Sequence, residues 1–127
     1  MLSNSKIQSI ILTSRPAMAE EFYCNVLGLE LKGKSDGALV FDVNGGALRV
    51  SEVPATAPTE HTVLGFSVPD VDSTVSWLGE RGIALERFPG FPHAANGTLT
   101  TPDGSIVAWF RDPDGNLLSV VQFPQSQ

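Results

Sequence analysis

The sequence FYCNVLGL at residues 22–29 combines an apolar helix face with a glycine stop. Met18, Phe22 and Val26 recur every four residues, which is the spacing of one face of an α-helix. Gly28 follows directly, and glycine readily adopts the left-handed conformation that ends many helices. The stretch therefore predicts one helix that buries this apolar face and stops at Gly28.

Strand patterns flank this helix on both sides. Residues 7–13, IQSIILT, are rich in β-branched side chains and predict a strand before it. Ser14 suits the N-cap of the helix, and Pro16 suits its first turn. Three short strands are expected after the helix, at residues 29–32, 38–43 and 47–53, with turns at 33–37 and 44–46. The second turn contains Asn44-Gly45, whose residues tolerate the positive φ of a tight hairpin.

The same order of elements returns after the Pro-rich stretch PATAPTE at residues 54–60, which is interpreted as a linker. A strand at residues 63–68 leads into a helix that begins at Pro69-Asp70. The apolar face of this helix is expected to contain Val71, Val75 and Leu78, and its stop Gly82. Three strands are expected at residues 83–88, 105–111 and 117–123, with a tight turn at 112–116 and a lid-like loop at 89–102.

Local similarity supports an internal repeat. Residues 28–31, GLEL, match residues 82–85, GIAL, and each half ends in a hairpin followed by an apolar strand. A repeat of this length predicts two equivalent halves, each a sheet with one helix on its outer face and a concave trough between the sheets. We therefore expect a single domain over residues 1–127, with half 1 at about 5–53, a linker at 54–60 and half 2 at about 61–123.

Bulk composition restricts the function classes. The chain has 127 residues, 42% apolar and 17% charged, as expected for a globular domain. The net charge of −6 argues against a nucleic acid partner, which would need a basic face. We expect no membrane partner, because no apolar run approaches the roughly 18 residues of a membrane span. We expect no secretory signal, because the N-terminus is polar and has no charged region followed by a long apolar stretch. The single cysteine, Cys24, excludes an intrachain disulfide and favours a cytoplasmic location.

Three segments carry a resemblance to a known family. Residues 22–29 resemble the FYxxxLGL element, residues 110–116, FRDPDGN, resemble the F-x-D-P-D-G-N signature, and residues 65–72, GFSVPDVD, resemble the second strand-to-helix junction of the vicinal oxygen chelate superfamily. That superfamily includes glyoxalase I, extradiol dioxygenases and bleomycin resistance proteins. The resemblance implies the α+β glyoxalase/bleomycin-resistance fold, in which two tandem βαβββ modules form a concave, half-open sheet trough. The motif residues themselves are interpreted as core and turn residues.

The resemblance also implies where a metal would bind. Metal-using members place four ligands in the trough, typically His or Gln, His, Glu and Glu. The corresponding positions here are Gln8, Arg49, Val63 and Ser119. Valine cannot bind a metal, serine is a poor neutral ligand, and the fixed charge of arginine repels a cation. We therefore expect no cofactor; if a divalent metal does bind, Gln8 and His61 are its candidate ligands.

Strand alternation predicts which side chains line the trough. The predicted ligand-binding residues are Gln8, Ile10, Leu12, Arg49, Val63, Trp109 and Ser119. Most of them are apolar, as is usual in a small-molecule pocket. Arg49 is the one fixed charge, so it pairs either with an acidic ligand or with a protein carboxylate such as Glu30 or Asp42. Trp109, Phe88 and Phe91 either belong to the ordinary core or form one end wall of the trough, where they would stack on a planar ligand.

Two classes of function fit this pattern. The first is a metal-independent module that binds and sequesters an amphipathic small molecule, as the bleomycin-binding members of the family do. The alternative is a metal-dependent enzyme: a lyase of the glyoxalase I type, a thiol transferase or a dioxygenase. A metal-free isomerase or hydrolase that uses Arg49 is a third hypothesis. The family resemblance also implies a homodimer, whereas the sequence assigns no ligand identity and no role to His61, His93 or Cys24.

Overall fold

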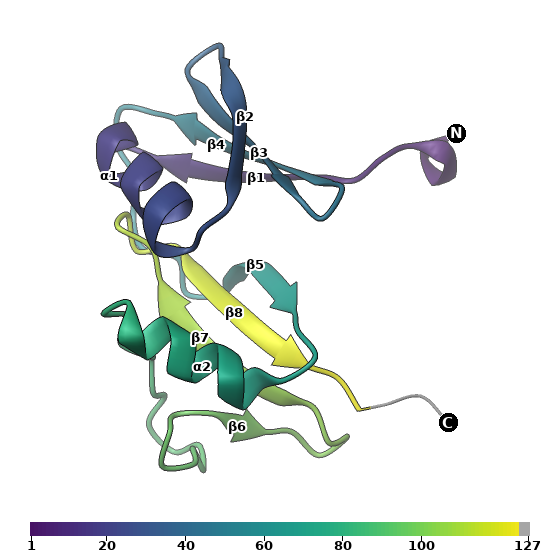
Figure 1. Ribbon diagram of the computed structural model, residues 1–127, viewed down its shortest axis with the longest axis vertical. Coiled ribbons are helices and arrows are strands. Elements are labelled where there is room, and N and C mark those ends of the chain that lie inside the picture. The colour runs from purple at the N-terminus through teal and green to yellow at the C-terminus, as the bar shows by residue number, and fades with distance from the viewer. Residues whose placement is uncertain (125–127) are drawn as a thin grey trace. The chain divides into compact units, whose positions relative to one another are not determined.

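The chain divides into two compact units, Met1–Pro58 and Thr59–Gln127, of which the computed structural model describes residues 1–124 (Figure 1). The boundary falls inside the predicted linker at residues 54–60. Each unit contains one four-stranded mixed sheet and one main helical segment. The predicted α+β fold with two repeated modules is therefore confirmed.

Unit 1 is built as the sequence pattern predicts, with small shifts in the element ends. Its elements are η1 (Leu2–Asn4), β1 (Gln8–Thr13), α1 (Pro16–Glu20), η2 (Glu21–Val26), β2 (Glu30–Ser35), β3 (Ala38–Val43) and β4 (Gly46–Glu52). The strand order is β1-β4-β3-β2. The β1 and β4 strands run parallel, whereas the other neighbours are antiparallel. The first and last strands of the unit are thus direct partners.

The start of α1 differs from the expected cap. Arg15, not Ser14, occupies the N-cap position, and no side chain caps the helix there. The hydroxyl of Thr13 accepts the backbone N–H of Arg15 at 3.0 Å, which satisfies one donor near the helix start. The Ser14 hydroxyl instead bonds the hydroxyl of Thr56 at 3.2 Å. The predicted Ser14 cap is therefore wrong, because that hydroxyl bonds the segment that follows β4.

The buried face of this helical segment is also one residue away from the predicted face. Ala19 and Tyr23 are fully buried, whereas Met18 is 51% exposed. The segment widens into a π-helix at η2, where the N–H of Leu27 bonds the carbonyl of Phe22 at 2.8 Å. The Tyr23 ring packs against Phe41 of β3, with 5.9 Å between the ring centroids. A spacing of four residues gave the correct period but the wrong face.

Turn residues set the strand ends of unit 1. Asn44 and Gly45 have φ of 50° and 87°, as predicted for the hairpin between β3 and β4. Asp36 and Gly37 form an equivalent pair, with φ of 50° and 74°. The earlier turn is therefore shorter than the predicted range 33–37, and β2 continues to Ser35 with a register shift beside Gly33.

Unit 2 repeats this arrangement. Its elements are β5 (Thr62–Ser67), α2 (Val71–Glu80), β6 (Leu99–Thr100), β7 (Ile106–Arg111) and β8 (Leu117–Gln122). The order is β5-β8-β7-β6, with β5 parallel to β8. The α2 helix begins at the N-cap Asp70 and buries the predicted residues Val71, Val75 and Leu78. Leu118 and Val120 are buried as well, as expected for the covered face of β8.

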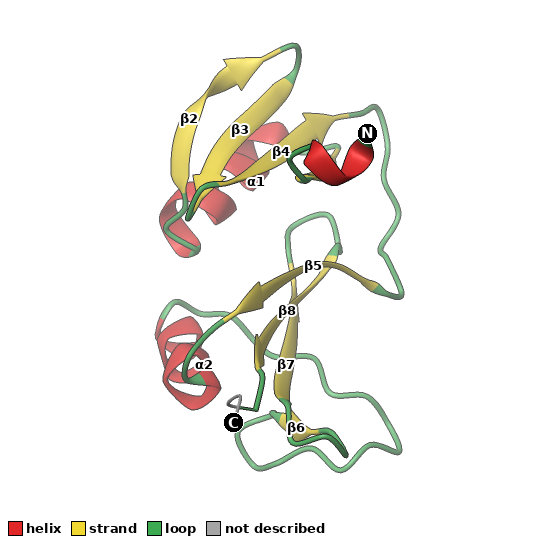
Figure 2. Ribbon diagram, turned by 90° about the vertical axis from the view of Figure 1, so that its right-hand side faces the viewer, coloured by secondary structure: helices red, strands yellow, loops and turns green. Residues whose placement is uncertain are grey.

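The fourth strand of unit 2 is not where the sequence places it. Residues 83–88 form no regular strand; only Glu86 makes an isolated bridge, to Trp109. The edge strand is β6, within the segment that was predicted to be loop (Figure 2). Pro89 lacks a backbone N–H, so the hydrogen bonding between residues 83–88 and β7 cannot continue far beyond Glu86. Leu99 is buried and pairs with Val107 of β7, so the edge strand forms there instead.

Candidate functional site

The sheet of unit 1 has one covered face and one open face. Along β1, Ile11 and Thr13 are buried, whereas Ile10 and Leu12 are 58% and 46% exposed. Gln8 is exposed on the same side as Ile10 and Leu12, because side chains alternate along a strand. Three predicted site residues therefore share the open face. Two large apolar side chains on such a face are typical of a surface that meets a ligand or another protein.

Arg49 lies next to these side chains. It is the partner of Ile10 in the parallel pairing of β1 with β4, and it is half-buried. One guanidinium nitrogen, Nη2, donates to the carbonyl of Ser35 at 3.3 Å. No hydrogen bond or ion pair joins Arg49 to Glu30 or Asp42 within the part of the chain that the structure describes; Glu30 pairs with Lys32 at 3.0 Å. A half-buried cation therefore stands beside an apolar surface.

Ser119 occupies the corresponding place in unit 2. It pairs with Gly65 on one side and with Trp109 on the other, so these three residues share the sheet face opposite α2. A Cβ atom on Gly65 would lie 3.1 Å from the Ser119 hydroxyl oxygen, so glycine gives this hydroxyl its space. Ser119 is only 7% exposed. Val63 is skipped by a register shift in β5, which places Thr62 opposite Leu117.

Trp109 belongs to an aromatic cluster with Phe88 and His93. Its ring centroid lies 5.2 Å from that of Phe88 and 6.2 Å from that of His93, both in edge-on geometry. The His93 Nε2 accepts the backbone N–H of Phe88 at 3.0 Å, so its Nδ1 carries the proton and donates to the Gly97 carbonyl at 2.8 Å. Both ring nitrogens are thus engaged, and His93 holds a loop together. Phe91, which the sequence grouped with this cluster, is 60% exposed.

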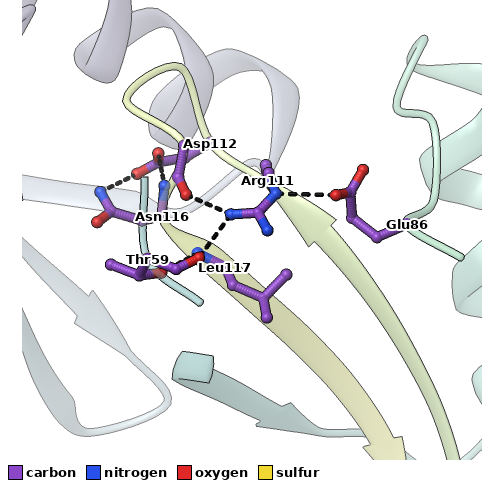
Figure 3. Close-up of polar contacts among 7 residues, drawn as sticks. Thr59, Glu86, Arg111, Asp112, Asn116 and Leu117 are labelled. Atoms are coloured by element: carbon purple, nitrogen blue, oxygen red, sulfur yellow. Dashed lines mark hydrogen bonds and ion pairs between the residues drawn. The ribbon is translucent and has the colours of Figure 1, made fainter. Parts of the chain in front are cut away.

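A charged cluster on unit 2 was missed by the sequence reasoning (Figure 3). The Arg111 Nε donates to the Glu86 carboxylate at 2.8 Å, and its Nη1 donates to the carbonyls of Thr59 and Gly115 at 2.8 Å and 2.7 Å. Glu86 bridges to Trp109, so its carboxylate lies on the sheet face that carries the aromatic cluster. Trp109 and Arg111 are two residues apart on β7, so strand alternation places both side chains on the same face of the sheet. This alternation was the sequence signal that could have placed Arg111 beside the aromatic cluster.

The turn at residues 112–116 is held from within. The Asp112 carboxylate accepts the backbone N–H groups of Asp114 and Asn116 and the Asn116 side-chain amide, at 3.0, 2.9 and 2.8 Å. Asp112 and Asn116 are both buried. These carboxylate oxygens therefore serve the turn, which supports the structural interpretation of this motif.

The implied metal does not fit the residues at the four ligand positions. Gln8 offers an amide and Ser119 a hydroxyl, while Arg49 and Val63 offer no donor to a cation. Over residues 1–124, no group of three or more His, Cys, Asp or Glu side chains is arranged to hold a metal ion. His61, the other candidate ligand, is exposed near the start of β5. A divalent ion would thus find no carboxylate and no imidazole among the four family positions.

Cys24 lies within η2 and is half-buried. Burial raises the pKa of its thiol, and the nearby Glu20 carboxylate raises it further. The thiol is therefore protonated near neutral pH and is a poor nucleophile. Cys24 accordingly contributes no reactive thiolate.

Comparison with known proteins places this geometry in a family. The model of the Glyoxalase/Bleomycin resistance protein/Dioxygenase superfamily matches residues 6–120. A comparison with curated proteins finds no match. No helix within residues 1–124 is both long enough and apolar enough to cross a membrane.

Two solved structures illustrate the similarity. TnmS3, an antibiotic-binding protein from Streptomyces sp. CB03234, is 25% identical with a TM-score of 0.74, and the match covers 98% of this chain and 99% of that one. The lactoylglutathione lyase from Agrobacterium tumefaciens is 20% identical with a TM-score of 0.73, covering 94% and 93%. With a family match over most of its length and the same fold in both structures, the chain belongs to the glyoxalase/bleomycin-resistance/dioxygenase superfamily.

Proposed function

We propose that the protein binds an amphipathic small molecule without a metal ion, and that the open sheet face around Arg49 is part of the binding site. The observation that carries this proposal is the exposure of Ile10 and Leu12 beside a half-buried guanidinium. Exposed apolar side chains favour a ligand with substantial carbon surface, since burying them removes apolar area from water. A single cation among them favours an anionic group on that ligand.

The aromatic cluster of unit 2 supports a planar ligand. Trp109 is half-buried on the sheet face that also holds Ser119 and Gly65. Its indole ring offers a large, rigid contact area for a flat molecule. We propose that Trp109 and Val63 also contact the ligand.

Similarity to the antibiotic-binding TnmS3 also supports a binding function. That protein is described as binding an antibiotic, and its fold extends over nearly the whole of this chain. A binding module needs no catalytic acid or base, and Arg49 is the one charged residue among the seven ligand-binding residues predicted from the sequence. The ligand proposed here is accordingly sequestered, not chemically altered.

Titration with 8-anilinonaphthalene-1-sulfonate, a planar aromatic anion, tests the proposal. We expect saturable fluorescence enhancement, and we expect Arg49→Ala to weaken the affinity roughly ten- to a hundredfold, because a charge-assisted hydrogen bond contributes about 1.5–3 kcal/mol. Lys32→Ala removes a positive charge from the same sheet and is the matched control. If both variants bind like the wild type while Arg49→Ala melts at a lower temperature, Arg49 is structural and the proposed anchor is wrong.

Metal independence is tested separately by elemental analysis of purified protein. We expect no stoichiometric Zn, Ni, Mn or Fe, because the four family positions supply no carboxylate or imidazole. About one ion per chain, lost on Gln8→Ala, would contradict this expectation and favour the metal-dependent lyase, thiol transferase or dioxygenase alternative.

We also propose that the protein forms a homodimer, as the family resemblance implies. The β1 strand is an edge strand of unit 1, and Ile7, which directly precedes it, is 87% exposed. Uncovered strand edges with exposed apolar residues favour pairing with another chain. Two identical chains most commonly cover such surfaces by pairing about a two-fold axis.

A further inference from the structure

Unit 1 contains a cavity of about 290 Å³ on the helix side of its sheet, where β1 ends and α1 begins. The buried residues Thr13, Leu39 and Val50 form part of its lining. Ala17 of α1 and Ala38 of β3 also line it, and their small side chains leave the space open. Val50 and Arg49 are neighbours on β4 and point to opposite faces of the sheet, so this cavity is separate from the proposed ligand face.

The lining of this cavity carries more negative than positive charge. Glu20, Lys34 and Glu52 contribute two carboxylates and one ammonium group. Lys34 pairs with Glu20, with 3.0 Å between Nζ and Oε1. Glu52 takes part in none of the three ion pairs found within residues 1–124. One carboxylate therefore stands beside an apolar floor without a cationic partner.

The pKa of the Cys24 thiol in η2 depends on two of these charged residues, Glu20 and Lys34. Besides the effect of burial, Glu20 raises the pKa of the Cys24 thiol more than Lys34 lowers it. The cavity lining itself carries two carboxylates and one ammonium group, so its net charge is negative. An added cation would be attracted to this part of the surface, and an added anion would be repelled.

We propose that this cavity binds a small organic ammonium ion that carries an apolar group. The ammonium group bonds the Glu52 carboxylate, and the apolar group lies against Leu39, Val50 and Ala38. The match rests on charge, since the unpaired group is a carboxylate, and on polarity, since most of the exposed lining is apolar. This site is independent of the Arg49 face and takes a ligand of opposite charge.

NMR titration of the ¹⁵N-labelled protein with benzylamine at neutral pH tests the site. We expect saturable shifts at the amides of Thr13, Ala17 and Ala38. Glu52→Gln should weaken the affinity about two- to fivefold, as expected for a solvent-exposed ion pair. Benzyl alcohol, which has the same ring without the charge, should bind the wild type more weakly by a similar factor.

Two further variants separate this site from nonspecific binding. Ala17→Leu fills the cavity from α1 with a good helix former and should remove the shifts at Thr13 and Ala38. Glu30→Gln removes a carboxylate from the same sheet outside the cavity and should leave the affinity unchanged.

The absence of saturable shifts would overturn the proposal, and so would equal affinity for benzylamine and benzyl alcohol. It would also be overturned if the shifts at these amides grew with protein concentration alone, because the cavity would then be occupied by a second copy of the chain. Arg49→Ala should leave benzylamine binding intact, so failure here is distinct from failure of the proposed function.

Discussion

At the scale of single residues, Asp70 shows how one carboxylate fixes the start of α2. Its Oδ2 accepts the Ser73 hydroxyl at 2.7 Å, and its Oδ1 accepts the backbone N–H groups of Ser73 and Asp72 at 3.4 Å and 3.1 Å. These bonds, led by the Ser73 hydroxyl, lower the pKa of Asp70 from its ordinary value. They stabilise the ionised form, so the cap is strongest when Asp70 is charged.

The sign of the pKa shift predicts the pH dependence of this cap. Because the pKa is lower in the folded chain, the stabilisation is present above the ordinary value of about 4 and is lost as the pH falls through the folded-state value. We therefore expect Asp70→Ala to lower the melting temperature at pH 7, and the difference from the wild type to shrink below about pH 4.

Asp70→Asn provides the control for this prediction. It keeps an acceptor oxygen but does not titrate, so its melting temperature should differ from that of Asp70→Ala by the same amount at every pH. If the difference in melting temperature between the wild type and Asp70→Ala stays constant from pH 7 to pH 3, the charge of Asp70 is irrelevant to the cap.

At the scale of elements, the segment between α2 and β6 is more ordered than its loop composition indicates. Arg87 donates to the carbonyls of Ala94 and Ala95 at 3.3 Å and 2.6 Å, and Asn96 donates to Asp72 of α2 at 2.8 Å. His93 adds a bond at each end of the loop, to Phe88 and Gly97. The segment that was predicted to be a lid, residues 89–102, is therefore held by hydrogen bonds up to β6, and the His93 side chain supplies two of them.

Removing that anchor should loosen the loop without unfolding the unit. In His93→Ala the N–H of Phe88 loses its acceptor, and we expect its hydrogen exchange to accelerate roughly ten- to a hundredfold, as about 1–3 kcal/mol of local stability implies. His61→Ala replaces an exposed histidine and should leave this exchange unchanged. Equal protection of Phe88 in His93→Ala and the wild type would exclude the anchoring role.

The elements that the sequence predicts well are those whose signals are local. Asp70 and Gly82 mark the two ends of α2, and Asn44-Gly45 marks a hairpin, because capping and positive φ depend on one or two residues. Asp36-Gly37 carried an equally local signal that the broader turn prediction obscured.

Elements that depend on distant partners are harder to predict. The β6 strand contains only Leu99 and Thr100, and it exists because β7 lies beside it. Ser14 had the chemistry of a cap, but Thr56 takes its hydroxyl.

The candidate site divides in the same way. Alternation along β1 correctly placed Gln8, Ile10 and Leu12 on one open face, because a strand has a fixed period of two. The Glu86–Arg111 pair could not be found by period alone, since Glu86 reaches Trp109 through one isolated bridge in an irregular segment.

At the scale of the whole molecule, the proposed homodimer predicts a mass in solution. Light scattering at micromolar concentration should give twice the chain mass of 13.5 kDa. Ile7→Lys should shift the protein toward the monomer, because a lysine beside an edge strand opposes pairing. Phe91→Lys changes another exposed apolar side chain, one that lies in a loop, and should leave the mass unchanged. A stable monomer in the wild type would refute the dimer.

The parallel pairing of first and last strands also constrains how the chain acquires its structure during synthesis. Gln8 pairs with Ala47, and Gly65 with Ser119, so each sheet is completed only when its final strand has left the ribosome. A nascent chain that ends at Val43 still exposes the β1 edge that β4 will occupy. Since this closure joins residues far apart in sequence, it is slower than hairpin formation. Folding should thus proceed in two late steps, one after β4 and one after β8.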